Sequence, residues 1–192
     1  MEIEAALLTS QILRFEFSDY VRIIPTAYHA TPLGCGVGHS RFGGTGKSFA
    51  TLYAARDLAT ALAETVIRDR FEGISDRRLF INELSTRSAV NIGSAEALHL
   101  IDLRKGGCLK LGVSTDIAGA KCFDEAQAFS DMLYKNLWID GILYASRLTG
   151  ENCIAIFDRA TKSHLSATDV TPLIRLKRMA EALQTLNVQL IL

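Results

Sequence analysis

Apolar and polar positions follow two different periods along this chain, and each period predicts a different kind of element. Short runs rich in β-branched and aromatic residues, bounded by polar or turn-forming positions, are typical of strands. The first run, Tyr-Val-Arg-Ile-Ile-Pro, ends at Pro25, which cannot donate a hydrogen bond to a sheet. On this basis we predict strands at residues 20–25, 50–54, 79–85, 98–103, 139–145 and 152–158.

Other segments carry apolar residues at helical spacing. Asp57 is a suitable N-cap for a helix that ends near residue 70, and Asp124 with Gln127 resembles a capping box for a helix through about Leu137. Strands outnumber helices and often follow one another directly, so the pattern predicts an α+β fold. We predict helices at residues 3–14, 57–70, 124–137 and 173–186, and an edge strand at 190–192.

Residues 26–48 hold six of the fourteen glycines and predict a long loop that can approach a ligand closely. Gly46-Lys47-Ser48 resembles the end of a phosphate-binding P-loop. That motif requires a glycine where this chain has Arg41, and it must open a helix, whereas residues 49–53 have a strand-like pattern. The loop therefore does not predict an ATPase or a GTPase.

Composition indicates a globular protein, which we expect to form a single domain over residues 1–192. Lysine plus arginine and aspartate plus glutamate both number 21, so there is no basic excess of the kind that nucleic-acid binding favours. The four cysteines lack zinc-knuckle spacing, and we expect reduced thiols and no metal site. No signal peptide or membrane-spanning run is visible, which predicts a cytoplasmic protein.

Glu64 and two arginines are candidate functional residues with ordinary alternatives. On the helix that starts near Asp57, Glu64 lies opposite the apolar face, where an exposed pair with Arg68 is the simplest interpretation. Arg22 points away from the core if Val-Arg-Ile alternates, so it is either solvated or a ligand anchor. Arg41 lies in the glycine-rich loop, where a solvated position and a phosphate contact are equally reasonable, because guanidinium groups bind phosphate with two parallel hydrogen bonds.

Tyr53 and Ser146 are weaker candidates when each is considered alone. Tyr53 lies in a predicted strand and is either a core residue or a stacking surface. Ser146 follows a predicted strand and could simply end it. Only the arrangement of these residues along the chain favours a shared site.

Three ordered segments within residues 20–160 together resemble the RES domain family. This family has similar strings in the same order, R-F-G, L-Y-x-A with A-L-A-E, D-G-I-x-Y-x-S and N-x-A-x-F-D. Residues 44–50 depart from the asparagine- and proline-rich loop of the family, and the segments 3–14 and 165–192 are additions without a motif. The matching strings are VRII at 21–24, SRFG at 40–43, LYAA at 52–55, TALAE at 60–64, DGILYASR at 140–147 and NCIAIFDR at 152–159.

The resemblance implies a fold like that of ADP-ribosyltransferases, with small twisted sheets around a cleft that binds NAD⁺ as substrate. It implies a toxin that cleaves the nicotinamide–ribose bond, by phosphorolysis to ADP-ribose 1″-phosphate or by hydrolysis, and an antitoxin of the Xre type. A protein ADP-ribosyltransferase and a non-catalytic binding module are the alternatives. The functional positions of the family correspond to Arg22, Arg41, Tyr53, Glu64 and Ser146.

Each of these positions has an expected role in such a reaction. Glu64 would stabilise the oxocarbenium-like sugar, because nicotinamide leaves as a neutral molecule and needs no general acid. Arg22 and Arg41 would bind the diphosphate, or Arg41 would bind incoming inorganic phosphate. Tyr53 would stack beside the nicotinamide or ribose, and Ser146 would hydrogen-bond the ligand at its nicotinamide end. No metal is required.

Overall fold

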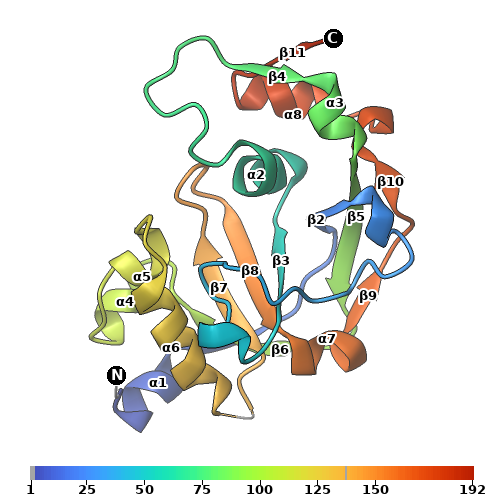
Figure 1. The fold of residues 1–192 in the computed structure, drawn as a ribbon. Helices are drawn as coiled ribbons and strands as arrows, with labels where there is room; N and C mark the ends of the chain where they lie inside the picture. The colour runs from blue at the N-terminus through green and yellow to red at the C-terminus, as the bar shows by residue number, and fades with distance from the viewer. Residues whose placement is uncertain (1–2, 137) are drawn as a thin grey trace.

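The protein is a mixed α+β structure built on one large sheet (Figure 1). The computed structural model describes residues 3–136 and 138–192. The sheet has nine strands in the order β1-β6-β7-β8-β3-β2-β5-β10, with β9 also paired to β5. Its strands are β1 (Ile12–Phe15), β2 (Tyr20–Pro25), β3 (Thr51–Ala55), β5 (Arg87–Ser94), β6 (Leu98–Asp102), β7 (Gly141–Ala145), β8 (Asn152–Phe157), β9 (Leu165–Ala167) and β10 (Thr171–Pro172).

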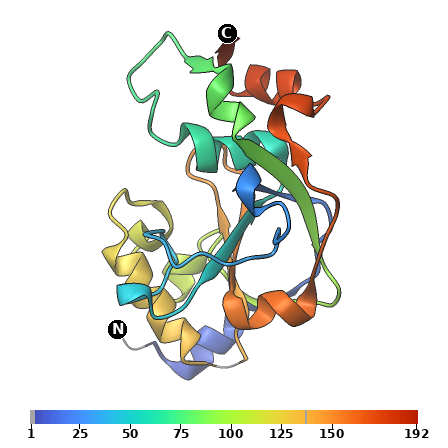
Figure 2. The same ribbon diagram turned by 45° about the vertical axis from the view of Figure 1, so that its right-hand side comes forward.

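The helices are short and lie around this sheet. Figures 1 and 2 place α4, α5 and α6 along one flank, and α3 and α8 near the C-terminus with a small second sheet of β4 and β11. None of the helices in the described part of the chain is both long and apolar enough to cross a membrane. Their bounds, with those of the second sheet, are α1 (Ala5–Ser10), α2 (Leu58–Leu62), α3 (Ile81–Ser85), α4 (Gly107–Lys110), α5 (Asp116–Gly119), α6 (Asp124–Tyr134), α7 (Asp158–His164), α8 (Met179–Thr185), β4 (Arg78–Phe80) and β11 (Gln189–Ile191).

The central strand β8 shows why the sheet is stable. Successive side chains of a strand point to opposite faces. On β8, Ala155 and Phe157 belong to the larger of two apolar clusters, whereas Ile154 and Ile156 belong to the other. All four side chains are fully buried, so both faces of the sheet are covered. Continuous apolar runs of this kind are what made the central strands predictable.

The sheet splits between β2 and β3. β2 pairs with β5 at six positions, but it pairs with β3 only where Val21 faces Ala55. At the other end of β3, Gly36 of the glycine-rich loop takes the vacated edge through two backbone hydrogen bonds with Thr51, of 3.4 and 3.2 Å. The split leaves open space between two strands that would otherwise be bonded along their length.

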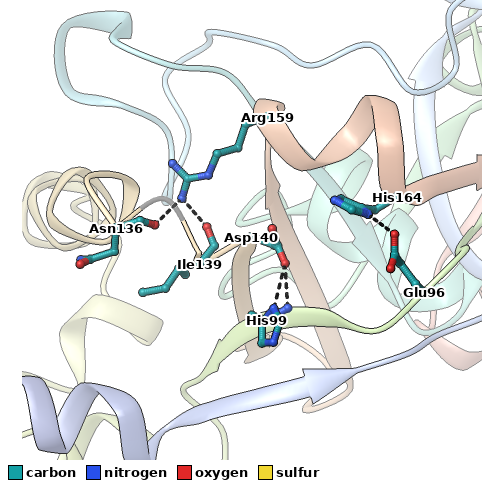
Figure 3. Close-up of polar contacts among 7 residues, drawn as sticks. All are labelled: Glu96, His99, Asn136, Ile139, Asp140, Arg159 and His164. Atoms are coloured by element: carbon teal, nitrogen blue, oxygen red, sulfur yellow. Dashed lines mark hydrogen bonds and ion pairs between the residues drawn. The ribbon is translucent and has the colours of Figure 1, made fainter.

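Arg159 of α7 and Asp140, which directly precedes β7, make polar contacts with neighbouring segments (Figure 3). The Arg159 guanidinium donates to the carbonyl oxygens of Tyr134, at 2.6 Å, and Asn136, at 2.9 Å, and also contacts that of Ile139. Asp140 accepts a hydrogen bond of 2.8 Å from the backbone N–H of His99. These contacts fix the connection between α6 and β7.

The α+β class is confirmed, but several predicted elements are wrong in detail. The predicted helix at 3–14 ends at Ser10, because Ile12–Phe15 form a strand paired with β6. The predicted strand at 79–85 is β4 followed by α3. No element was predicted for residues 87–94, which form β5. The edge strand expected at 190–192 is confirmed as β11, which pairs with β4 in parallel.

The predicted helices at 57–70, 124–137 and 173–186 also differ. The first is α2 followed by a π-helical turn, Ala63–Ile67, and the third is a 3₁₀ turn, Leu173–Arg175, followed by α8. The second is α6, which ends at Tyr134, and the expected end at Leu137 lies outside the described residues. Its predicted capping box is wrong, because the Gln127 amide donates to the carbonyl oxygen of Ser40 instead, at 3.0 Å.

Candidate functional site

A cleft of about 570 Å³ lies at the split between β2 and β3. Its walls come from β2, the glycine-rich loop, β3, the α2–π-turn unit and the turn between β7 and β8. A cleft of this size suits a small-molecule ligand. Four of the five predicted site residues line it, namely Arg22, Arg41, Tyr53 and Glu64.

Glu64 enters the cleft from the π-helical turn that follows α2. Asp57 caps α2 as predicted, accepting a hydrogen bond of 2.7 Å from the backbone N–H of Thr60. The chain then changes to π-helical geometry over Ala63–Ile67, closed by a hydrogen bond of 2.7 Å from Arg68 N to Ala63 O. Single π turns inside helices are rare and often lie at functional sites. The sequence left open an exposed ion pair between Glu64 and Arg68. The ion pairs of the described residues do not include it, and the Glu64 side chain is half-buried.

Ser146 lies behind Glu64 and holds it. The Ser146 hydroxyl donates to Glu64 Oε1 at 2.6 Å and accepts from the backbone N–H groups of Leu148 and Thr149, at 3.1 and 3.2 Å. With two donors already directed at its oxygen, the hydroxyl has its one proton free for the carboxylate. Ser146 is buried and is not among the cleft-lining residues, so its position differs from that of the ligand contact expected from the sequence.

Arg22 and Arg41 bring positive charge to the cleft and form none of the ion pairs of the described residues. Each has a buried Nη1 atom without a hydrogen-bond partner among the described residues. Arg22 donates from Nη2 to the carbonyl oxygen of Gly34 at 2.5 Å, and Arg41 lies 5.0 Å from the centre of the Phe123 ring. A buried charged donor without a partner is costly, and an anionic ligand would satisfy it.

The two arginines share the direction of their pKa shifts but have different neighbours. Burial lowers the pKa of both guanidinium groups. For Arg41, the neighbouring Tyr144 and Glu64 raise the pKa in opposition to burial, whereas for Arg22 the opposing neighbour is Cys35. Both guanidinium groups are thus partly removed from water in the cleft.

Tyr53 connects β3 to the glycine-rich loop. Its hydroxyl accepts from the backbone N–H of Phe42 at 2.8 Å and donates to Ser40 Oγ at 3.0 Å. Burial raises the pKa of Tyr53 to about 12, so the phenol is neutral at physiological pH. The side chain packs against the larger apolar cluster and also lines the cleft. It thus combines the two alternatives, core residue and cleft surface, that the sequence left open.

The cleft includes further charged and aromatic residues that the sequence did not single out. Arg68, Arg147 and Asp69 line it, as do Tyr144 and Phe123. Arg147 follows Ser146 directly and forms an ion pair with Asp69. The signal for Tyr144 and Arg147 was their place in the DGILYASR string, whereas Phe123 carried no local signal. For Arg68, the sequence predicted only an exposed ion pair with Glu64.

The described residues offer no metal-binding constellation. Within residues 3–136 and 138–192, no three histidine, cysteine, aspartate or glutamate side chains converge as a ligand set. The four cysteines are unpaired thiols, of which Cys108 and Cys153 are buried and Cys122 is exposed. Lys47, the residue of the rejected P-loop motif, is exposed in a short 3₁₀ turn and does not open an α-helix.

The split sheet and its cleft define an α+β protein with a candidate small-molecule site, which combines the anchored Glu64 carboxylate with two arginines that form no ion pair among the described residues. The family model for the RES domain matches residues 16–178. That range covers most of the described chain, including the whole cleft. The chain therefore belongs to the RES domain family.

Two relatives agree with this assignment. "Probable toxin y4kH" of Sinorhizobium fredii (strain NBRC 101917 / NGR234) is 38% identical over 85 residues, which are 42% of this chain and 64% of the relative. This chain thus spans just under two-thirds of that relative. A chain in the crystal structure of the M. tuberculosis MbcT–MbcA toxin–antitoxin complex aligns over 93% of this chain and 100% of its own, with a TM-score of 0.62 and 17% identity. This likeness shows a shared fold.

Proposed function

We propose that this protein is an NAD⁺-degrading toxin that cleaves the bond between nicotinamide and ribose. The observation that carries the proposal is the pairing of a fixed carboxylate with unsatisfied guanidinium groups in one cleft. Glu64 is held by Ser146, while Arg22 and Arg41 each have a buried Nη1 without a partner among the described residues. A dinucleotide offers a matching ligand, with a diphosphate for the arginines and a ribose that becomes cationic as its glycosidic bond breaks.

Glu64 is the proposed catalytic residue. The pyridinium nitrogen takes the electron pair of the breaking bond, so nicotinamide leaves as a neutral molecule, and positive charge develops on the ribose. A preorganised carboxylate stabilises such a charge more than water does, because it needs no reorientation as the charge forms. Ser146 acts through Glu64 as a positioning residue, since its hydroxyl proton is directed at Oε1.

Inorganic phosphate is the proposed acceptor. One phosphate oxygen forms a bond to the anomeric carbon as the bond to nicotinamide breaks, and the products are ADP-ribose 1″-phosphate and nicotinamide. Water in the same position would give ADP-ribose. Arg22 and Arg41 would bind the substrate diphosphate, and Tyr53, neutral and fixed by two hydrogen bonds, would form the wall beside the ribose or nicotinamide.

An antitoxin is the proposed partner. One relative is called a probable toxin, and the structural neighbour is described as part of a toxin–antitoxin complex. The Xre type of antitoxin is proposed from the family resemblance, and a cytoplasmic location is proposed from the sequence features given above. Near-neutral net charge is compatible with a protein partner, since it imposes little long-range repulsion.

The test is the loss of NAD⁺ in the presence of the purified protein, with products separated by chromatography in phosphate buffer and in phosphate-free buffer. Glu64→Gln is expected to lower turnover about 100-fold or more while the fold is kept. Glu125→Gln, an exposed position on α6, is the matched control. Arg22→Ala is expected to weaken NAD⁺ binding about tenfold. Full turnover by Glu64→Gln, or no NAD⁺ loss with the wild type, would refute the proposal.

A further inference from the structure

The cleft has more cationic side chains than a dinucleotide diphosphate requires. Its lining includes five cationic side chains and only two carboxylates, Glu64 and Asp69. A diphosphate brings two negative charges, which Arg22 and Arg41 match. Three cations therefore remain at the Glu64 side or the rim of the cleft, namely Arg68, Lys121 and Arg147. Lys121 already pairs with Glu72 outside the cleft lining.

Arg68 is an exposed residue that lines the cleft and has an unusual backbone conformation. It follows the π-helical turn with φ 49° and ψ −129°, a conformation that residues other than glycine rarely adopt. Such strain costs on the order of 1–3 kcal/mol and is found where function requires the resulting geometry. In this case it ends the π turn and leaves Arg68 lining the cleft, with no ion pair among those of the described residues.

Arg147 approaches the same place from the turn between β7 and β8. It directly follows Ser146, the residue that holds Glu64, and its guanidinium pairs with Asp69. Asp69 is the next residue after Arg68, so the same backbone conformation positions both. The pair is partly exposed, with 29% of the Arg147 side chain and 44% of the Asp69 side chain accessible. An exposed pair of this kind is weak, and an incoming dianion can compete with the carboxylate for the guanidinium.

We propose that Arg68 and Arg147 form a second oxyanion subsite that binds a phosphoryl group on the Glu64 side of the cleft. The inference rests on the proposed function for the identity of the reaction. The location favours free inorganic phosphate, because the acceptor must reach the same anomeric carbon that Glu64 faces. A different dinucleotide substrate could supply the same chemistry through a phosphate ester, such as the 2′-phosphate of NADP⁺.

The first experiment measures phosphate binding without NAD⁺, so that it does not depend on turnover. Calorimetric titration of inorganic phosphate into the full-length protein in a chloride buffer compares the wild type with Arg68→Gln and Arg147→Gln. Each variant is expected to weaken phosphate binding about tenfold, because each removes charged hydrogen-bond donors. Arg14→Gln, an exposed position on β1, is the matched control and is expected to match the wild type.

A second experiment separates the two phosphate sources. With NAD⁺ as substrate, Arg68→Gln is expected to raise the KM for phosphate about tenfold while the KM for NAD⁺ stays within twofold. If the variants instead weaken NADP⁺ binding and leave phosphate binding unchanged, the subsite stands and its ligand is the nucleotide phosphate. Unchanged affinity for both ligands in both variants overturns the subsite. The two proposals can also fail separately. If the wild type binds phosphate but does not cleave NAD⁺, and both variants lose phosphate binding, the proposed function is refuted and the subsite is supported.

Discussion

The hydrogen bond between Ser146 and Glu64 leads to a quantitative prediction for Ser146→Ala. Ser146 Oγ makes three hydrogen bonds, one to the carboxylate at 2.6 Å and two from the backbone N–H groups of Leu148 and Thr149, at 3.1 and 3.2 Å. Alanine removes all three without adding volume to a buried site. The substitution therefore separates a loss of positioning from a steric effect.

The expected loss of activity follows from the bond to the carboxylate. A hydrogen bond to a charged group contributes about 1.5–3 kcal/mol, and each 1.36 kcal/mol of barrier changes a rate about tenfold. If that bond holds Glu64 where the sugar charge develops, Ser146→Ala lowers kcat about 10- to 100-fold. The backbone donors lie in a turn that water can reach, so the free energy of unfolding falls by only about 1 kcal/mol.

The assay is steady-state NAD⁺ cleavage with kcat and KM measured separately, together with urea unfolding of the same samples. Ser166→Ala is the control, because that serine is exposed and bonds only to a carbonyl oxygen, of Gly93. A positioning role lowers kcat and leaves KM nearly unchanged, whereas a direct ligand contact raises KM. A kcat for Ser146→Ala within twofold of the wild type would refute the reasoning.

Three further predictions concern stability and the thiols. Arg159→Met is expected to lower the free energy of unfolding by about 3 kcal/mol in urea titrations, because three carbonyl oxygens lose a charged donor, whereas Arg78→Met on the surface changes it by less than about 0.5 kcal/mol. Burial raises the pKa of Asp102, but hydrogen bonds from Arg104 outweigh it and hold that pKa below its ordinary value of 3.8. The folded state thus binds this proton less readily than the unfolded chain, so the stabilisation is present above about pH 4 and is lost as pH falls through the folded-state pKa. Asp102→Asn should therefore be less stable than the wild type at pH 7. In acid unfolding curves, the difference in stability between the two proteins should vanish. Cys122, the exposed thiol, should react first with a maleimide by mass spectrometry, and faster labelling of either fully buried cysteine would contradict the burial described above.

The predictability of the strands depended on how many of their faces are buried. Residues 152–158 were found from sequence because both faces of β8 are covered and its apolar run is continuous. Residues 20–25 were found because apolar residues that favour strands flank the single Arg22. β5 was missed because its sequence, Arg-Ser-Ala-Val-Asn-Ile-Gly-Ser, mixes polar and small residues, and it is held by pairing with β2 over six positions. In the same way, Ile12–Phe15 have an apolar spacing compatible with a helix, and only pairing with β6 makes them a strand. The paired residues are 62 to 72 positions apart for β2 and β5 and 83 to 89 positions apart for β1 and β6, which local patterns do not encode.

Four of the five predicted site residues share one cleft, but its geometry was not predictable from the sequence. The local pattern placed Glu64 on the exposed face of a continuous helix, whereas the structure places it, half-buried, in the π turn after α2. Two features change the outcome, the π turn at Ala63–Ile67 and the distant β7–β8 turn that brings Ser146 against the carboxylate. The same turns bring Arg68 and Arg147 into the cleft. The environment of a carboxylate on a polar helix face therefore depends on segments distant in sequence, and in this fold the β7–β8 turn supplies the Ser146 hydroxyl and the Arg147 guanidinium group.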